Sequence, residues 1–206
     1  MKTLFIPANS KLIVDKSKIL EISKKLPKNI AIAYSIQYQN QAREIKSLLK
    51  SHNITSLTQV LGCSKPNFPK NTEAILLLSD GKFHAIALSF ETKLPVFLFE
   101  NNKLSEISKE DINNFEKKQK VAYLKFLQAD KVGILISTKP GQQNLKKALS
   151  LKKKLKEKQS YLFISNNINT SEFENFPEIQ SWVNTACPRM DMNNSKIINI
   201  SKLLQY

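Results

Sequence analysis

Two cysteines are the residues of this sequence best suited to bind a metal, and each stands where an apolar stretch ends. Cys63 closes "VLGC", and Cys187 lies in "SWVNTACPRMD", directly before Pro188. Thiolates bind iron–sulfur clusters, zinc and copper(I). The spacing has no C-x-x-C motif, as in a zinc ribbon or an ordinary ferredoxin. The thiols could share a metal only if separate loops bring them together. Two buried free thiols are the alternative, and a disulfide is disfavoured in an intracellular protein.

Two further segments place polar residues and glycine directly after apolar runs. "LSDGKFH" follows "AILLL", and "ISTKPGQQN" follows "VGILI". Glycine allows a sharp turn, and the N–H groups at a helix start can hold an anion. Each motif alone is also typical of a plain turn, and "STKPGQ" lacks the Gly-Lys-Ser/Thr ending of a P-loop. The candidate binding residues are Asp80, Gly81, Lys82, His84, Ser137, Lys139, Gly141, Gln142 and Arg189.

The elements that must position these loops alternate between strand and helix. The predicted strands are 3–7, 29–35, 56–62, 74–79, 95–100, 132–137, 161–165 and 181–186. Several are continuously apolar, as expected of parallel strands covered on both faces. The predicted helices are 16–26, which opens near the cap residue Asp15, and 41–52, 109–129 and 144–158. In open parallel sheets, ligands gather at the carboxyl ends of the strands, where the candidate loops are expected.

The alternation predicts an α/β fold with right-handed crossovers. A boundary is expected after the long helical segment. We therefore predict two tandem three-layer α/β domains with mainly parallel sheets, residues 1–129 and 130–206, which could be diverged copies of one unit. No apolar run approaches the roughly 20 residues of a membrane span, and the N-terminal apolar stretch is too short for a signal peptide. We expect a soluble cytoplasmic protein.

The formal net charge is +15, from 32 Lys and Arg against 17 Asp and Glu. Such a balance can attract nucleic acid or a partner bound to it. Lys, Asn and Ile are abundant together, however, and arginine occurs only as Arg43 and Arg189, whereas readers of nucleic acid rely on arginine and exposed aromatic residues. Compositional drift is therefore the favoured explanation, and the lysines of 144–158 are interpreted as a solvated helix face. The retained Arg189 could be needed for its planar guanidinium.

Four motifs together resemble a known family. "VLGC", "SDGKFH", "ISTKPGQ" and "WVNTACPR" occur in the same order in the diphthamide-synthesis enzymes, the archaeal and eukaryotic 2-(3-amino-3-carboxypropyl)histidine synthases. "WVNTACPR" and "STKPGQ" are specific motifs. The resemblance covers essentially the whole chain and corresponds to the second and third of the family's three homologous α/β domains.

The resemblance implies a cofactor and a reaction. In this family one cysteine from each of three domains holds a 4Fe-4S cluster, and the fourth iron is open to S-adenosylmethionine. Radical chemistry transfers the 3-amino-3-carboxypropyl group to a histidine of translation elongation factor two, the first step of diphthamide formation. Cys63 and Cys187 match the cysteines of the second and third domains. The turns Asp80–Gly81 and Lys139–Gln142 are candidates to hold S-adenosylmethionine, and Arg189 to orient the loop around Cys187.

The chain also departs from the family pattern. The first domain and its cysteine are missing, Lys82 stands where the family generally has arginine, and the segment before Cys63 is shortened. Two thiolates alone would leave two irons of a cubane unprotected. Three explanations compete: a split enzyme completed by a separate first-domain chain, a scaffold paralog of a complete enzyme, and a relic or binding module whose cysteines are only buried thiols. A basic RNA- or ribosome-binding module is the alternative from a different class of function. Retention of both cysteines favours the first, a hetero-oligomer that needs a reductant.

Overall fold

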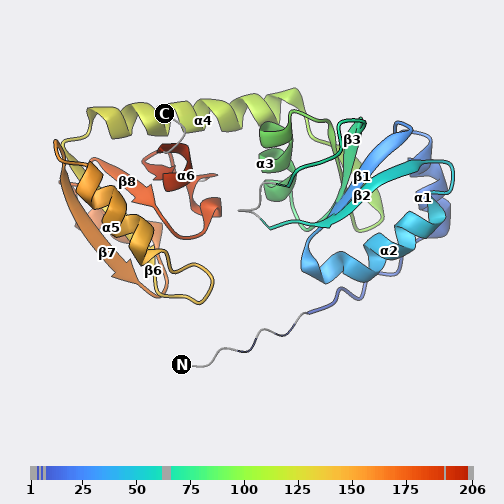
Figure 1. The fold of residues 1–206 in the computed structure, drawn as a ribbon, viewed down its shortest axis with the longest axis horizontal. Helices are drawn as coiled ribbons and strands as arrows, with labels where there is room; N and C mark the ends of the chain where they lie inside the picture. The colour runs from blue at the N-terminus through green and yellow to red at the C-terminus, as the bar shows by residue number, and fades with distance from the viewer. Residues whose placement is uncertain (1–3, 5, 7, 62–65, 193, 204–206) are drawn as a thin grey trace. The chain divides into compact units, whose positions relative to one another are not determined.

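The computed structural model describes residues 4, 6, 8–61, 66–192 and 194–203 (Figure 1). The chain forms two compact units, Met1–Asn113 and Asn114–Tyr206. The division falls inside one long helix, α4 (Lys109–Gln128), because Ala122 and Phe126 in its second half belong to the core of the second unit. The boundary predicted at residue 129 concerns the domains of the family and stays a prediction.

The first unit is built on a five-stranded sheet. Its elements before α4 are α1 (Lys16–Ser23), β1 (Asn29–Tyr34), η1 (Ile36–Tyr38), α2 (Gln39–Leu48), β2 (Asn53–Gln59), β3 (Ala74–Leu78), α3 (Phe83–Thr92), β4 (Val96–Glu100) and β5 (Lys103–Glu106). The strand order is β2-β1-β3-β4-β5. The first four strands are parallel, and β5 runs antiparallel to β4. Asn101 and Asn102, both with positive φ, form the two-residue turn of this hairpin.

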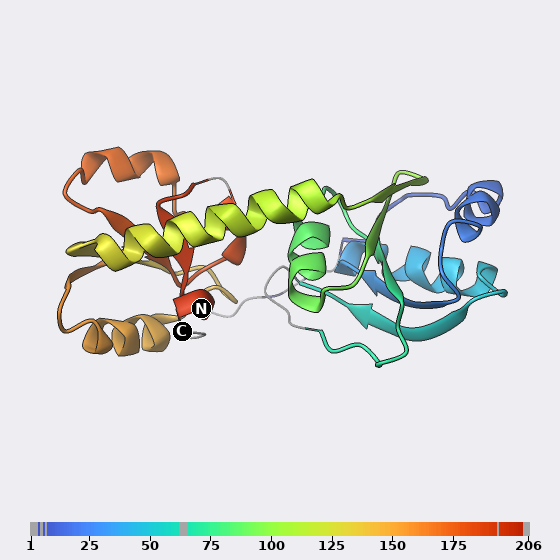
Figure 2. The same ribbon diagram turned by 90° about the horizontal axis from the view of Figure 1, so that it is seen from above.

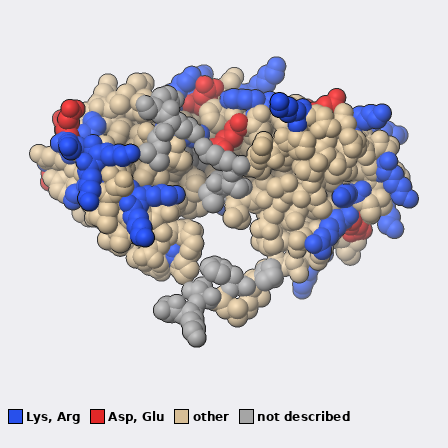
Figure 3. All heavy atoms as spheres, viewed as in Figure 1, with Lys and Arg blue, Asp and Glu red and all other residues tan. Residues whose placement is uncertain are grey.

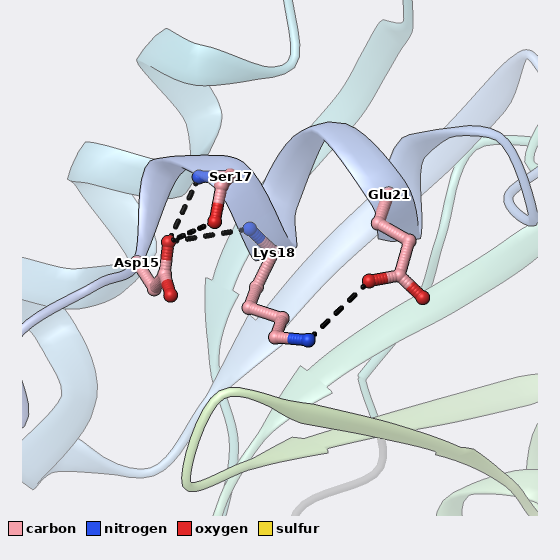
Figure 4. A network of polar contacts seen from close by, with 4 residues as sticks. All are labelled: Asp15, Ser17, Lys18 and Glu21. Atoms are coloured by element: carbon pink, nitrogen blue, oxygen red, sulfur yellow. Dashed lines mark hydrogen bonds and ion pairs between the residues drawn. The ribbon is translucent and has the colours of Figure 1, made fainter.

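Helix α1 begins at the cap that the sequence predicts. The carboxylate of Asp15 accepts hydrogen bonds from the backbone N–H groups of Ser17 (2.9 Å) and Lys18 (3.3 Å) and from the Ser17 hydroxyl (2.6 Å; Figure 4). These bonds satisfy N–H groups that have no partner inside the helix. The exposed ion pair between Lys18 and Glu21 follows on the same helix at 3.5 Å and contributes little.

Both faces of the first sheet are covered. On one face, Ile30 and Ile32 of β1 pack in a single cluster with residues of α1 and α2. The alternate residues Ala31 and Ala33 are equally buried on the other face, and α3 packs against β4. Burial of every side chain along β3 is what parallel strands between two layers require.

The second unit repeats the same strand order. After the second half of α4 it contains β6 (Lys131–Ser137), α5 (Leu145–Lys154), β7 (Gln159–Ser165), η2 (Thr170–Asn175), β8 (Ser181–Asn184), η3 (Pro188–Met192), β9 (Ile197–Asn199) and α6 (Ile200–Leu203). All four strands are parallel, in the order β7-β6-β8-β9. With β6 matched to β1, this is the order β2-β1-β3-β4 of the first unit. The two units thus share one winding, and their origin as diverged copies stays a prediction.

An aromatic cluster covers one face of the second sheet. Trp182 of β8 is 1% exposed, stacks on Phe173 of η2 at 4.1 Å between ring centroids, and contacts Phe163 edge-on at 4.7 Å. Gly133, its register partner on β6, leaves room for the indole: a Cβ built there would lie 2.4 Å from a ring carbon of Trp182. The opposite face packs against α5 and the second half of α4. Figure 2 shows α5 and η2 on opposite sides of this sheet.

The prediction of an α/β fold with two mainly parallel sheets is confirmed. Helices α3 and α6 and strands β5 and β9 are not among the predicted elements, and strand β2 covers Asn53–Gln59 instead of the predicted 56–62. Of the predicted strand 3–7 the structure describes only Leu4 and Ile6, and neither lies in a strand. Among the described helices, none combines the length and apolar character needed to cross a bilayer.

Candidate ligand site at the carboxyl ends of the strands

The strand order locates a candidate site in each unit. The order reverses between β1 and β3 in the first unit and between β6 and β8 in the second. At such a switch point the loops diverge to opposite faces and open a crevice outside the carboxyl ends of the strands. Ser137 is the last residue of β6, His84 lies in the first turn of α3, and Arg189 lies in η3. All the described candidate residues stand at or just after the ends of β3, β6 and β8: Asp80, Gly81, Lys82, His84, Ser137, Lys139, Gly141, Gln142, Cys187 and Arg189.

In the first unit, Asp80 follows β3 and is held by two residues of the neighbouring loop. Its carboxylate accepts a hydrogen bond from Nε2 of Gln37 (3.0 Å) and a short hydrogen bond from the hydroxyl of Tyr38. Burial, and after it the bond to Asp80, which favours the protonated phenol, together raise the pKa of Tyr38 to about 12. Asp80 therefore has a fixed orientation at the end of β3. Gln37 and Tyr38 were not among the predicted site residues.

The turn after Asp80 is held by a hydrogen bond to the last residue of β4. Gly81 has a φ of +69°, and its N–H donates to Oε1 of Glu100, at the end of β4, at 2.8 Å. No heavy atom lies within 4 Å of a Cβ built at Gly81, so the left-handed backbone, and not a lack of space, favours glycine here. His84 Nδ1 lies 3.3 Å from the Ser79 hydroxyl. His84, the second residue of α3, is thus hydrogen-bonded to the residue that follows β3.

Lys82 points to the start of α4. Its Nζ lies 3.3 Å from Oδ2 of Asp111, and both side chains are partly exposed. The hydroxyl of Ser108 donates to the same oxygen at 2.8 Å. The Ser108 bond first, and then the bond and charge of Lys82, lower the pKa of Asp111 below its ordinary value. A solvent-exposed pair of this kind is weak, so an anionic ligand could compete for Lys82.

In the second unit, the "STKPGQ" segment forms a tight turn. The N–H of Gln142 donates to the carbonyl of Lys139 at 3.0 Å, and Gly141 has a φ of +79°. Proline followed by glycine in the middle of such a turn is typical of type II. Ser137, which is buried, accepts a bond from the N–H of Lys139 (3.1 Å) and donates to the carbonyl of Asn166 (3.2 Å). The turn is thereby anchored to the ends of β6 and β7.

Cys187 stands on a loop whose backbone is hydrogen-bonded at many points. Asn184 and Asn199, the last residues of β8 and β9, bind this loop through their amides. The amide of Asn144, beside the Pro-Gly turn, donates to the carbonyl of Thr185 at 2.7 Å. The structure thus brings the two predicted loops of the second unit together. Cys187 is half-buried with a free thiol, and Arg189 is exposed.

The described residues present one thiol that suits a soft metal. Within this part of the chain no group of three His, Cys, Asp or Glu side chains is close enough together to hold a metal. Cys187 is suited to serve as one ligand of an iron atom, because its thiol is in no disulfide, is half-buried and is carried by a hydrogen-bonded loop. Cys63 lies outside the described residues. The prediction that the two thiols meet therefore stays a prediction.

The strand order and the switch-point loops define a doubly wound α/β protein with its candidate site at the carboxyl ends of the strands. A family model described as "Putative diphthamide synthesis protein" matches residues 1–197. The chain belongs to this family of diphthamide synthesis proteins.

Named relatives agree with this assignment. The chain is 30% identical over 208 residues to the 2-(3-amino-3-carboxypropyl)histidine synthase of Pyrococcus horikoshii, covering 93% of this chain and 60% of that protein. It is 32% identical over 210 residues to the synthase of Methanocaldococcus jannaschii, covering 94% and 57%. The crystal structure of Dph2 from Pyrococcus horikoshii with a 4Fe-4S cluster is similar with a TM-score of 0.78 and 25% identity, covering 93% of this chain and 61% of that one. The chain thus spans 57–60% of the length of these relatives.

Proposed function

We propose that this chain is a subunit of a split 2-(3-amino-3-carboxypropyl)histidine synthase. It would help to transfer the 3-amino-3-carboxypropyl group of S-adenosylmethionine to a histidine of translation elongation factor two. Family membership, the names of the relatives and the cluster-bearing Dph2 structure support this proposal. The single observation that carries it furthest is Cys187, a free and half-buried thiol on a fixed loop within the motif "WVNTACPR".

In this proposal Cys63 and Cys187 each contribute one thiolate to a 4Fe-4S cluster. When bound and reduced, the cluster would supply the electron that breaks the bond between sulfur and the aminocarboxypropyl group. The 206 residues contain no third cysteine, and a cubane with one open iron needs three protein ligands. We propose that a separate chain carrying a first domain supplies the third thiolate, and that a reductant delivers the electron.

The two switch-point loops would hold the amino-acid part of S-adenosylmethionine. Asp80 offers a carboxylate in a fixed orientation, because Gln37 and Tyr38 bind it, and a carboxylate suits an ammonium group. Lys82 and Lys139 carry positive charge that suits a carboxylate, and Lys82 gives up only an exposed ion pair on binding. Positioning of this kind would be the protein's share of the chemistry, since the cofactor performs the bond cleavage.

The lysines of α5 and the segment after it would dock the protein substrate. A single glutamate, Glu157, follows six exposed lysines there: Lys146, Lys147, Lys152, Lys153, Lys154 and Lys156. Figure 3 shows blue side chains gathered over α5 with little red between them. A surface of one sign speeds the encounter with a partner of the opposite sign. We propose that this face meets an acidic face of the elongation factor.

The test is anaerobic co-expression with a candidate chain that carries the third cysteine, followed by quantification of iron and sulfide and an assay of S-adenosylmethionine cleavage. We expect cluster and cleavage only when both chains are present. Cys63→Ser and Cys187→Ser should each abolish cluster retention, whereas Ser171→Ala, an exposed position in η2, should leave it unchanged. A normal cluster in either cysteine variant would show that the ligand assignment is wrong. A complete cluster on this chain alone would refute the split enzyme.

A further inference from the structure

Two asparagines at the ends of neighbouring strands grip the loop that carries Cys187. Oδ1 of Asn184 accepts the N–H of Ala186 at 2.8 Å, and its Nδ2 donates to the carbonyl of Cys187 at 2.7 Å. The same Nδ2 donates to Oδ1 of Asn199 at 2.6 Å. Nδ2 of Asn199 in turn donates to the carbonyl of Pro188 at 3.0 Å. The backbone on both sides of the thiol is thus bound by two amides in series, which we call the amide clamp.

The clamp is buried and its side-chain atoms are paired. Asn184 is 1% exposed and Asn199 is 6% exposed, and the two residues are direct register partners on β8 and β9. A buried polar side chain costs free energy unless it is hydrogen-bonded, so the two buried amides at these strand ends need partners. Here the partners are the backbone groups of the cysteine loop and the neighbouring amide, so this loop conformation satisfies both amides.

The chemistry of the clamp requires carboxamides. Asn184 accepts one bond through its oxygen and donates two through its nitrogen. An aspartate of the same shape would accept but not donate while ionised, and a leucine would do neither. Asn184 therefore binds two groups of the same loop at once: the N–H of Ala186, two residues further along the chain, and the carbonyl of Cys187, three residues further along. Short-range bonds of this kind make asparagine a builder of fixed loops.

Further bonds fix the loop before and after the clamp. The hydroxyl of Thr185 donates to the carbonyl of Leu135 on β6 at 2.7 Å, and the carbonyl of Thr185 accepts from Asn144 at 2.7 Å. The N–H of Met190 reaches the carbonyl of Cys187 at 3.2 Å. A ligand loop that is already ordered loses less conformational entropy on metal binding than a flexible one.

We propose that Asn184 and Asn199 are positioning residues for Cys187, which hold the thiol in its metal-binding place before a cluster arrives. The word "metal-binding" rests on the proposed function, whereas the clamp itself rests on the hydrogen bonds above. Outer groups that orient a ligand commonly change metal affinity about 10- to 100-fold when they are removed. We expect a loss of cluster retention of this order when the clamp is broken.

The first test uses the metal-free chain with Cys63→Ser, so that Cys187 is the one remaining thiol. Asn184→Ala should speed hydrogen exchange at the amides of Ala186 and Met190 by about tenfold, the order expected for one lost hydrogen bond. It should also speed alkylation of Cys187 by iodoacetamide. Exchange at the β6 amides should not change. Asn175→Ala, which removes an exposed amide of η2, is the matched control and should leave both measurements at the parent value.

Asn199→Ala keeps the proposal testable if the Asn184 variant does not fold. It removes the bond to Pro188 but leaves both bonds between Asn184 and the loop, so a smaller acceleration of alkylation is expected. Unchanged exchange and alkylation in a folded Asn184 variant would overturn the clamp. So would an acceleration spread equally over β6.

The second test uses the two-chain assembly with its cluster. Asn184→Ala should lower iron retention and broaden the electron paramagnetic resonance signal of the reduced cluster, whereas Asn175→Ala should do neither. An unaltered signal and full iron content in the Asn184 variant would overturn its role in positioning a ligand. If the metal-free results are as expected but Cys187→Ser keeps its cluster, the proposed function fails and the clamp stands as a feature of the loop alone.

Discussion

Replacing Gly133 by alanine tests how closely β6 and β8 approach beneath the aromatic cluster. A Cβ at residue 133 would lie 2.4 and 2.5 Å from two ring carbons of Trp182 and 3.1 Å from Cγ2 of Ile179. Separations below 3 Å cannot be tolerated, so the indole must move. It has little space, because Phe173 stacks on it at 4.1 Å and Phe163 contacts it at 4.7 Å.

The expected magnitude follows from two opposing effects. Alanine in place of glycine within a strand gains about 0.5–1 kcal/mol, because the unfolded chain loses freedom. Overpacking a tight core costs about 1–3 kcal/mol. We therefore expect Gly133→Ala to lower the free energy of unfolding by about 1–2 kcal/mol. With a urea slope near 2 kcal/mol per M, a loss of about 1.5 kcal/mol lowers the unfolding midpoint by about 0.7 M.

The assay is urea unfolding followed by tryptophan fluorescence, since Trp182 is the one tryptophan of the sequence. The native emission should also change, because the indole is displaced. Gly141→Ala is the control: its φ of +79° costs about 1–2 kcal/mol in an L-residue, but no atom lies within 4 Å of the new Cβ, so native emission should stay the same. A Gly133→Ala protein as stable as the parent with unchanged emission would refute the packing argument.

Three further predictions concern single residues and one surface. The pKa of Tyr38 is raised to about 12, so the stability that its protonated hydroxyl contributes is complete below pH 10 and is lost between pH 10 and 12. Ultraviolet titration should show one tyrosine that ionises at higher pH than the others. Tyr38→Phe should remove this signal, and Asp80→Asn should shift it to lower pH. The pKa of Asp15 is lowered by its bond to Ser17, so the N-terminal amides of α1 should lose protection from hydrogen exchange as pH falls through that pKa, and Asp15→Ala should abolish the dependence. Changing Lys152, Lys153 and Lys154 to glutamate should slow association with the elongation factor and flatten its salt dependence; steep salt-dependent binding to RNA with no effect on the factor would instead favour an RNA-binding role.

Much of the fold could be predicted because buried parallel strands are continuous apolar runs. The runs 74–79 and 132–137 show this directly and become β3 and β6. Helix α3 could not be predicted from an apolar pattern in this way. Its sequence lacks an evident polar face, because four of its residues are buried: Ala85, Ile86, Leu88 and Ser89. Strands β5 and β9 have four and three residues, too few for a period to stand out.

The sequence predicts which loops form the candidate site, but not which side chains hydrogen-bond to one another there. Asp80 and Cys187 stand after apolar runs, and their positions at strand ends follow from that. Tyr38 reaches Asp80 across 42 residues, and Asn199 reaches Asn184 across 15. Nothing in the local sequence reveals such partners, because the strand order that brings them together is decided by packing of the whole sheet. Asparagine after a strand is the one available signal, and it is common in turns.

The repeated strand order has a consequence for anyone who would rebuild this protein from one of its halves. In the second unit Cys187 follows β8, the counterpart of β3, whereas in the first unit Asp80 stands just past the end of β3. Superposing the two windings would place Cys187 near the position that Asp80 occupies in the first unit. Equivalent strand ends thus carry a carboxylate bound by two side chains in one unit and a thiol in the other, so a tandem of two identical halves would not reproduce this chemistry.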